Sequence, residues 1–132
     1  MASELKVDKF TGVTTAGSIS VTGEGNSTTT NLQQGLNKVW LQYDQSSSTA
    51  IQDSFNVASI ADNATGKATT TYTNPMNSTS YAIGGCCQGN GFITIPATGP
   101  DTDNTGALVT VSNGGSDVDY NHVGPSVKGD LA

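Results

Sequence analysis

Three side chains in the C-terminal half of the chain are of the types that take part in metal or nucleophilic chemistry. Cys86 and Cys87 are adjacent, and His122 is the only histidine. A structural zinc site needs more ligands than these residues supply. A disulfide between neighbouring residues closes a strained ring, because successive side chains of a strand point to opposite faces. We therefore expect two reduced, partly buried thiols in a strand, with a bridge between subunits as the alternative.

His122 could also act as a general base, since Asp117 and Asp119 lie near it and serines are plentiful. A nucleophilic serine of one large hydrolase class stands on a Gly-x-Ser-x-Gly turn, and the sequence lacks this pattern. In a strand, His122 would share a face with Tyr120, and both aspartates would point the other way. We therefore expect a structural or surface histidine.

The acidic residues raise two further possibilities. Asp101–Gly106 places oxygen-bearing side chains at alternate positions before a glycine, like the start of a calcium-binding loop, but Ser112 stands where that loop has its bidentate Glu. A pair of carboxylates could hydrolyse a glycoside, yet none of the eleven Asp and Glu has a sequence context that indicates burial. We expect a solvated loop, no metal, no cofactor and no enzyme.

Charge argues against several classes of partner. The 132-residue chain has a formal net charge of -6, and its five Lys and Arg residues are not clustered. Nucleic acids and anionic membrane surfaces are bound by clustered basic side chains, so we expect neither as a partner. The N-terminus lacks a hydrophobic signal region, and no apolar run is long enough to span a bilayer. Synthesis and folding in a cytoplasm are therefore expected.

Short strands are the elements that would position these side chains. Only 34% of the residues are apolar, sixteen are glycine, and Ser, Thr and Asn form long tracts. Threonine suits pleated surfaces, and many short strands with closely spaced turns are typical of a sandwich. We expect an all-β fold, an antiparallel, jelly-roll-like β-sandwich over residues 32–132. Strands are expected at residues 38–44, 51–60, 67–73, 92–95, 107–112 and 118–122, and another begins at residues 81–83 and either ends at Gly84-Gly85 or continues into the cysteines. Gly124-Pro125 is expected to end the last strand, before a tail from Ser126 to Ala132.

The first of these strands carries the only tryptophan. Alternation predicts that Val39, Leu41 and Tyr43 share one face, and that Trp40 lies on the other face among polar neighbours such as Lys38. A ring of this size needs a second packing partner. That partner is either a second sheet of a closed sandwich or another copy of the chain. The next segment is expected to form a hairpin over residues 51–73.

One stretch resembles a known class of proteins. It consists of Lys38-Val-Trp-Leu-Gln-Tyr-Asp44, Asp53-Ser-Phe-Asn-Val-Ala-Ser-Ile60, the turn Asp62-Asn-Ala-Thr-Gly66 and Thr71-Tyr-Thr73. Virion proteins of tailed bacteriophages, including tail-fibre and other surface-appendage proteins of marine phages, contain a similar series. Theirs has a Lys-Ala-Trp-Val-Asn-Phe strand, then Asn-Val-Ser-Ser-Ile-x-Asp-Asn-Gly-Thr-Gly and a Tyr-Thr-Val-Asn-Phe strand. The chain departs from it at residues 41–43 and at Ala64, and neither departure disrupts a strand or a turn.

The resemblance implies a non-enzymatic structural protein of the virion. It favours a fibre-like surface appendage involved in attachment to the host cell surface, with a capsid decoration protein as the first alternative and a carbohydrate-binding module as the second. It also implies a homotrimer, whereas the scarcity of apolar residues by itself indicates only an oligomer. Host surface glycans are a further expected partner, because polar loops on a rigid sandwich offer dense hydrogen bonding.

Residues 1–31 are expected to form an extended arm for attachment to other virion proteins and for oligomerisation. The two weak strands of this arm hold too few apolar residues to fold alone. Thr28–Leu36 is expected to form either one helical turn, capped by Thr29 or Thr30 and ended by Gly35, or an extended connector. The expected subunit contacts are Trp40, Ile19, Val21, Leu32 and Leu36.

Deletion of Met1–Gly23 should leave a folded β domain, because the arm is expected to contribute nothing to the core. Circular dichroism of the truncated chain should retain its strand signal, while the protein should no longer join the particle. A truncated chain that fails to fold would show that the arm belongs to the core and that the boundary is wrong.

Overall fold

The structure, a computed structural model, describes residues 4–12, 19–23, 29–94 and 105–129. It divides into two compact units, Met1–Leu36 and Asn37–Ala132. The described part of the first unit contains strand β1 (Ser20–Thr22), which pairs with β2 (Thr29–Asn31), and the short helix α1 (Leu32–Gly35). No helix in the described ranges has the length and apolar character needed to cross a membrane.

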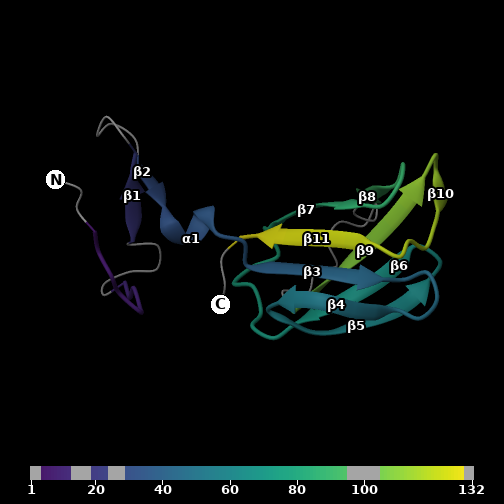
Figure 1. Cartoon of the computed structure of the whole chain (residues 1–132), viewed down its shortest axis with the longest axis horizontal. Coiled ribbons are helices and arrows are strands. Elements are labelled where there is room, and N and C mark those ends of the chain that lie inside the picture. The colour runs from purple at the N-terminus through teal and green to yellow at the C-terminus, as the bar shows by residue number, and fades with distance from the viewer. Residues whose placement is uncertain (1–3, 13–18, 24–28, 95–104, 130–132) are drawn as a thin grey trace. The chain divides into compact units, whose positions relative to one another are not determined.

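The second unit is all-β, as predicted, and is built from two antiparallel sheets (Figure 1). One sheet contains β3 (Val39–Asp44), β4 (Ala50–Phe55), β7 (Ala82–Cys87) and β11 (Val123–Lys128), in the order β4-β3-β11-β7. The other contains β5 (Val57–Ala64), β6 (Lys67–Tyr72), β8 (Phe92–Thr94), β9 (Gly106–Asn113) and β10 (Ser116–Asp117), in the order β10-β9-β6-β5 with β8 paired to β9. The C-terminal strand β11 thus lies between β3 and β7.

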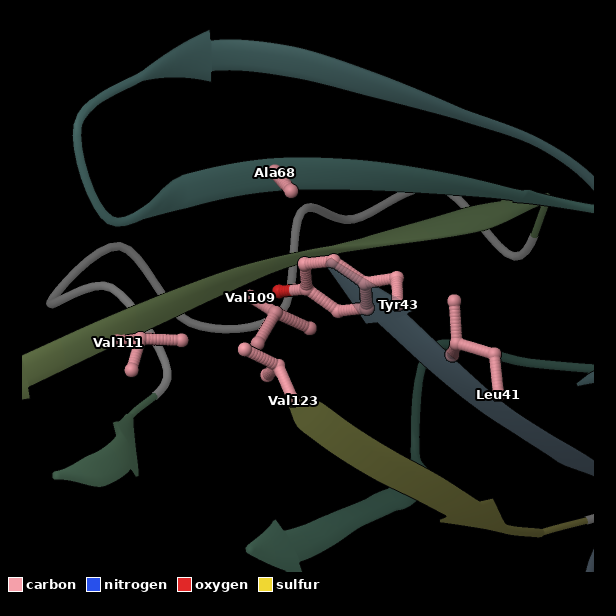
Figure 2. Packing of buried hydrophobic residues seen from close by; sticks show 6 residues of the cluster. All are labelled: Leu41, Tyr43, Ala68, Val109, Val111 and Val123. Carbon is pink, nitrogen blue, oxygen red and sulfur yellow. The ribbon is translucent and has the colours of Figure 1, made fainter. Parts of the chain in front are cut away.

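The core lies between these sheets and follows from alternation along the strands. Figure 2 shows one cluster, to which the four-stranded sheet contributes Leu41, Tyr43 and Val123, and the five-stranded sheet contributes Ala68, Val109 and Val111. A second cluster consists of Val39, Tyr72, Met76, Ala107 and Val127. Both sheets supply both clusters, so burial of apolar area, at about 25 cal/mol per Å², holds the two layers of the sandwich together.

The hydroxyl groups of two core tyrosines, Tyr43 and Tyr72, are buried without a hydrogen-bond partner. Tyr43 is fully buried, and its hydroxyl makes no hydrogen bond. Burial raises the pKa of this hydroxyl, and the nearby Cys87, Asp119 and Asp62 raise it further. A free tyrosine is already protonated at neutral pH, and the raised pKa keeps the Tyr43 hydroxyl protonated further into the alkaline range.

The hairpin predicted over residues 51–73 is correct only from Val57 onward. β5 and β6 form it, and Gly66 in its turn has a φ of 67°, in the left-handed region that glycine adopts readily. Residues 51–55 instead belong to β4 and pair with β3 in the other sheet. Between β4 and β5, Asn56 takes a φ of 61° and redirects the chain, and its side chain donates to the backbone oxygens of Lys38 and Asn74, both at 3.1 Å.

The prediction for the C-terminus is wrong. Residues 118–122 form no strand, and β11 contains Gly124 and Pro125, which were expected to end one, together with part of the expected tail. β11 pairs with β7 without interruption, including Pro125 opposite Gly85, whereas its pairing with β3 skips residues 124 and 125. Pro125 therefore fits a central strand because its missing N–H falls in the gap of the ladder with β3.

Two smaller predictions also fail. Lys38 was expected on the face of Trp40, but it is buried whereas Trp40 is exposed. Its backbone N–H donates to the carbonyl oxygen of Val127 at 2.9 Å. Thr29 and Thr30 lie in β2 and do not cap α1, although that helix ends at Gly35 as predicted.

The close approach of β7 to β11 predicts a contrast between two adjacent glycines. A methyl group at Gly85 would overlap the backbone of Gly124 and Pro125, whereas one at Gly84 would meet no atom within 4 Å. We expect Gly85→Ala to lower the free energy of unfolding by about 1–3 kcal/mol, the usual cost of overpacking. The matched control Gly84→Ala should change it by less than about 0.5 kcal/mol. Urea denaturation measures both, and equal destabilisation would contradict the pairing of β7 with β11.

Candidate functional site

The outward-facing side of the four-stranded sheet, hereafter the outer face, carries two exposed aromatic side chains. Trp40 in β3 and Phe55 in β4 are directly opposite each other and are 37% and 52% exposed. Side chains opposite each other in an antiparallel pair lie on the same side of the sheet. The same row continues from Trp40 to Ser126 in β11 and from there to Gly84 in β7. Side-chain size therefore decreases along this row, hereafter the aromatic row, from the rings of Phe55 and Trp40 to Ser126 and then to Gly84, which has no side chain.

A row of polar groups runs beside this aromatic row. Gln42 follows Trp40 by two residues, hence by about 7 Å along the strand. It is opposite Asp53 in β4, and its Nε2 lies 3.1 Å from Nδ1 of His122. The carboxylate of Asp53 is oriented by the N–H of Ser54, which donates to Oδ1 at 2.8 Å. An amide, a carboxylate and an imidazole thus lie next to the rings.

A depression open to solvent adjoins the polar row. It has a volume of about 370 Å³ and is lined by Cys86, Cys87, Gln88, Asn121 and His122. This volume lies within the range of small-molecule sites, about 300–1,000 Å³. The N–H of Gln88 donates to the carbonyl oxygen of His122 at 2.9 Å and so joins the two segments that line the depression. Cys86 follows Gly84 by two residues in β7, which connects the depression to the aromatic row.

The two cysteines lie at the end of β7, within the strand expected for them, and are free thiols. The prediction of partly buried thiols is wrong for Cys86, which is exposed, whereas Cys87 is half-buried as expected. Burial raises the pKa of the Cys87 thiol, and the neighbouring Cys86 adds to the effect. A raised pKa disfavours the reactive thiolate, so Cys87 lacks the environment of an activated nucleophile.

The other candidate sites from the sequence are separated or undescribed. Among the described residues, no group of three or more His, Cys, Asp and Glu side chains could hold a metal ion. Residues 101–104 of the calcium-like segment lie outside the described ranges. Asp117 forms an ion pair with Lys67 at 3.1 Å, and Asp119 accepts a hydrogen bond from the N–H of Gly66, so neither is joined to His122 by these contacts.

The five predicted subunit contacts fall into the two separate units. Trp40 lies on the outer face, so the alternative that buries it inside a closed sandwich is wrong. In the first unit, Val21 and Leu36 are 52% and 53% exposed. Ile19 and Leu32 are half-buried and are joined by a 2.9 Å hydrogen bond from the N–H of Leu32 to the carbonyl oxygen of Ile19. The role of all five in subunit contacts stays a prediction.

Sequence reasoning missed Phe55 and Asp53 as neighbours of Trp40. The register of β4 against β3 shifts between Gln42 and Tyr43, so that Tyr43 is opposite Ile51 and Gln42 is opposite Asp53. This bulge lets Ile51 pack against the core while Asp53 lies on the outer face. Uninterrupted alternation would have placed both on one face, and no residue in the segment signals the bulge.

The outer face is suited to noncovalent binding, because its rings offer apolar surface and its polar row offers donors and acceptors. Comparison with known proteins found no family model, no curated protein and no solved structure that matches the chain.

The different surroundings of the two thiols predict different reactivity. In Cys87→Ser, the remaining exposed Cys86 should react quickly with a disulfide reagent such as dithionitrobenzoate. In Cys86→Ser, Cys87 should react more slowly at neutral pH, and its rate should rise at higher pH, because a raised pKa leaves less thiolate at any lower pH. Absorbance at several pH values measures both rates. Equal rates and equal pH dependence would contradict the placement of the two side chains.

Proposed function

We propose that this chain is a structural protein of a bacteriophage virion, a fibre-like surface appendage that takes part in attachment to the host cell surface. The observation that carries the proposal is the exposure of Trp40 and Phe55 on the outer face of a β-sandwich. Large apolar rings exposed together on a protein with few apolar residues mark a surface that binds something. The rigid sheet beneath them serves as a platform for such a surface.

The resemblance to virion proteins supports this assignment. The residues that carry it form β3, the second half of β4, most of β5 with the turn at Gly66, and the end of β6, and these strands belong to both sheets. The likeness therefore concerns the scaffold of the sandwich as well as the surface around Trp40. It carries no catalytic residues, and the proposed role is non-enzymatic.

The first unit is proposed to serve assembly. Among the residues of this unit that the structure describes, the exposed large apolar side chains are Leu5, Val7, Phe10, Val21 and Leu36, with exposed fractions between 47% and 73%. Apolar side chains left in water are stabilised when another surface covers them, at about 25 cal/mol per Å². We assign them to contacts among three copies of the chain and with other virion proteins, so that the protein resides in the virion.

A carbohydrate-binding module is the second candidate function. It is favoured by the combination of Trp40 with Gln42, Asp53 and His122, since rings beside hydrogen-bonding groups can hold a sugar. A module of this kind would bind sugar as a purified protein and would be absent from virions.

Mass spectrometry of purified phage particles tests the proposed location. We expect the protein in a few copies per particle, as for an appendage. Hundreds of copies would assign it to the capsid as a decoration protein, and its absence from particles would overturn the virion assignment.

The oligomeric state provides a separate test. Sedimentation at micromolar concentration should give a trimer, and the double variant Val21→Ser, Leu36→Ser should lower the trimer fraction because it removes exposed apolar area from the first unit. Thr22→Ser, in the same strand as Val21, is the matched control and should leave the trimer unchanged. A folded wild-type chain that sediments as a monomer would refute the trimer.

A further inference from the structure

We propose that the outer face binds a neutral glycan, with one sugar ring stacked on Trp40 and its hydroxyl groups hydrogen-bonded by the polar row of Gln42, Asp53 and His122. The inference deepens the proposed attachment function by naming the ligand class and the residues, and it rests on that function for its role in attachment. Its physical basis lies in four features of the second unit.

The first feature is an aromatic ring that is exposed and yet held in place. Trp40 is 37% exposed, so most of its surface is covered by neighbouring residues. The face of an aromatic ring is electronegative and attracts the weakly positive C–H groups on the apolar side of a pyranose. A ring that is already positioned loses little conformational entropy on binding, which favours affinity. Phe55 directly opposite extends the apolar surface toward a second sugar unit.

The second feature is the spacing between the ring and the polar row. Gln42 lies about 7 Å from Trp40 along β3, which is close to the length of one pyranose unit with its hydroxyl groups. Asp53 can accept from hydroxyls, the amide of Gln42 can donate or accept, and Nε2 of His122 is not engaged by the Gln42 contact, which is made through Nδ1. A sugar on Trp40 would therefore meet both donors and acceptors.

The third feature is the space beside Trp40. Ser126 and Gly84 continue its row, and a Cβ at Gly84 would have no atom within 4 Å. Along β7 this low surface leads to Cys86 and the 370 Å³ depression. The ring thus stands beside a lower, open region in which a sugar can lie against it.

The fourth feature is charge, and it separates a glycan from a second copy of the chain. A second copy that packed on this face through its own outer face would bring its own Asp53 to the contact. Burial of a carboxylate without a partner is costly, and interface cores are depleted in charged residues. A neutral glycan leaves Asp53 hydrated or hydrogen-bonded. An acidic glycan would be repelled by Asp53. The nearest lysine of β11, Lys128, lies two residues beyond Ser126 and on the opposite side of the aromatic row from the polar row, so it does not offset this repulsion.

Titration calorimetry and fluorescence with defined oligosaccharides test the proposal. Neutral hexasaccharides of glucose in β-1,4 and α-1,4 linkage and of xylose serve as probes, with an oligogalacturonate as the anionic comparison. We expect at least one neutral probe to bind, the anionic probe to bind more weakly, and Trp40 fluorescence to shift to shorter wavelength. Because Trp40 is the only tryptophan, the shift reports on this face alone.

Variants assign the binding to the outer face. Trp40→Ala should weaken the bound neutral probe by about tenfold or more, and Trp40→Phe should retain part of the affinity. Gln42→Ala tests the polar row by a change that leaves the ring in place. Phe92→Ala is the matched control, because Phe92 is 67% exposed in β8 of the other sheet and should not affect binding. Circular dichroism verifies the fold of each variant.

The alternatives give different results. Failure of all neutral probes to bind, or equal binding by Trp40→Ala and the wild type, overturns the proposal. Loss of assembly by Trp40→Ala without any glycan binding assigns the face to a second copy instead, as the predicted subunit contact requires. If the protein binds a glycan but is absent from purified particles, the virion function is overturned and the glycan site is supported. If it is present in particles but binds no glycan, the glycan site is overturned and the virion function is supported.

Discussion

The insertion of β11 between β3 and β7 is the constraint on which the rest of the sandwich depends. This C-terminal strand supplies Val123 to one core cluster and Val127 to the other, so both clusters require it. It can lie against β7 only because Gly85 lacks a side chain where the backbone of Pro125 passes. The same register places Ser126 between Trp40 and Gly84 and thereby shapes the outer face.

The placement of two large apolar side chains on the outer face indicates that this face binds a ligand or a partner. The chain has few of them, and burial of each would stabilise the core by an amount that grows with its area. Trp40 and Phe55 nevertheless lie outside the core, opposite each other and beside hydrogen-bonding groups. An arrangement of this kind loses stability in the isolated chain and gains it only when a ligand or a partner covers the rings.

Local patterns predicted local features of the fold. Alternation alone identified the buried face of β3 with Tyr43, and the Asp62–Gly66 sequence identified the turn of the β5–β6 hairpin. The all-β class likewise follows from short alternating runs between turn residues. These features depend on residues close together in the sequence, which is why the sequence reveals them.

The remaining features depend on pairings between distant segments. Nothing near Asn56 indicates that β4 and β5 belong to different sheets, and nothing near Gln42 indicates the bulge that brings Asp53 to the outer face. Pro125 argued against a central strand, and it is tolerated only because β7 offers Gly85 and the ladder with β3 has a gap. The sequence left two outcomes for Trp40, burial in a closed sandwich or exposure to a partner. That it is exposed, with Phe55 and Asp53 on the same face, is evident only from the structure.

The most direct test of this account is the accessibility of Trp40 in the purified, folded chain without ligand. Acrylamide quenching of its fluorescence, measured at concentrations low enough to prevent association, reports whether solvent reaches the indole. The account predicts emission of a partly exposed indole and efficient quenching that decreases when the outer face is covered. Emission at short wavelength with little quenching, unchanged on dilution, would show that Trp40 lies in the core and would contradict the outer face as a binding surface.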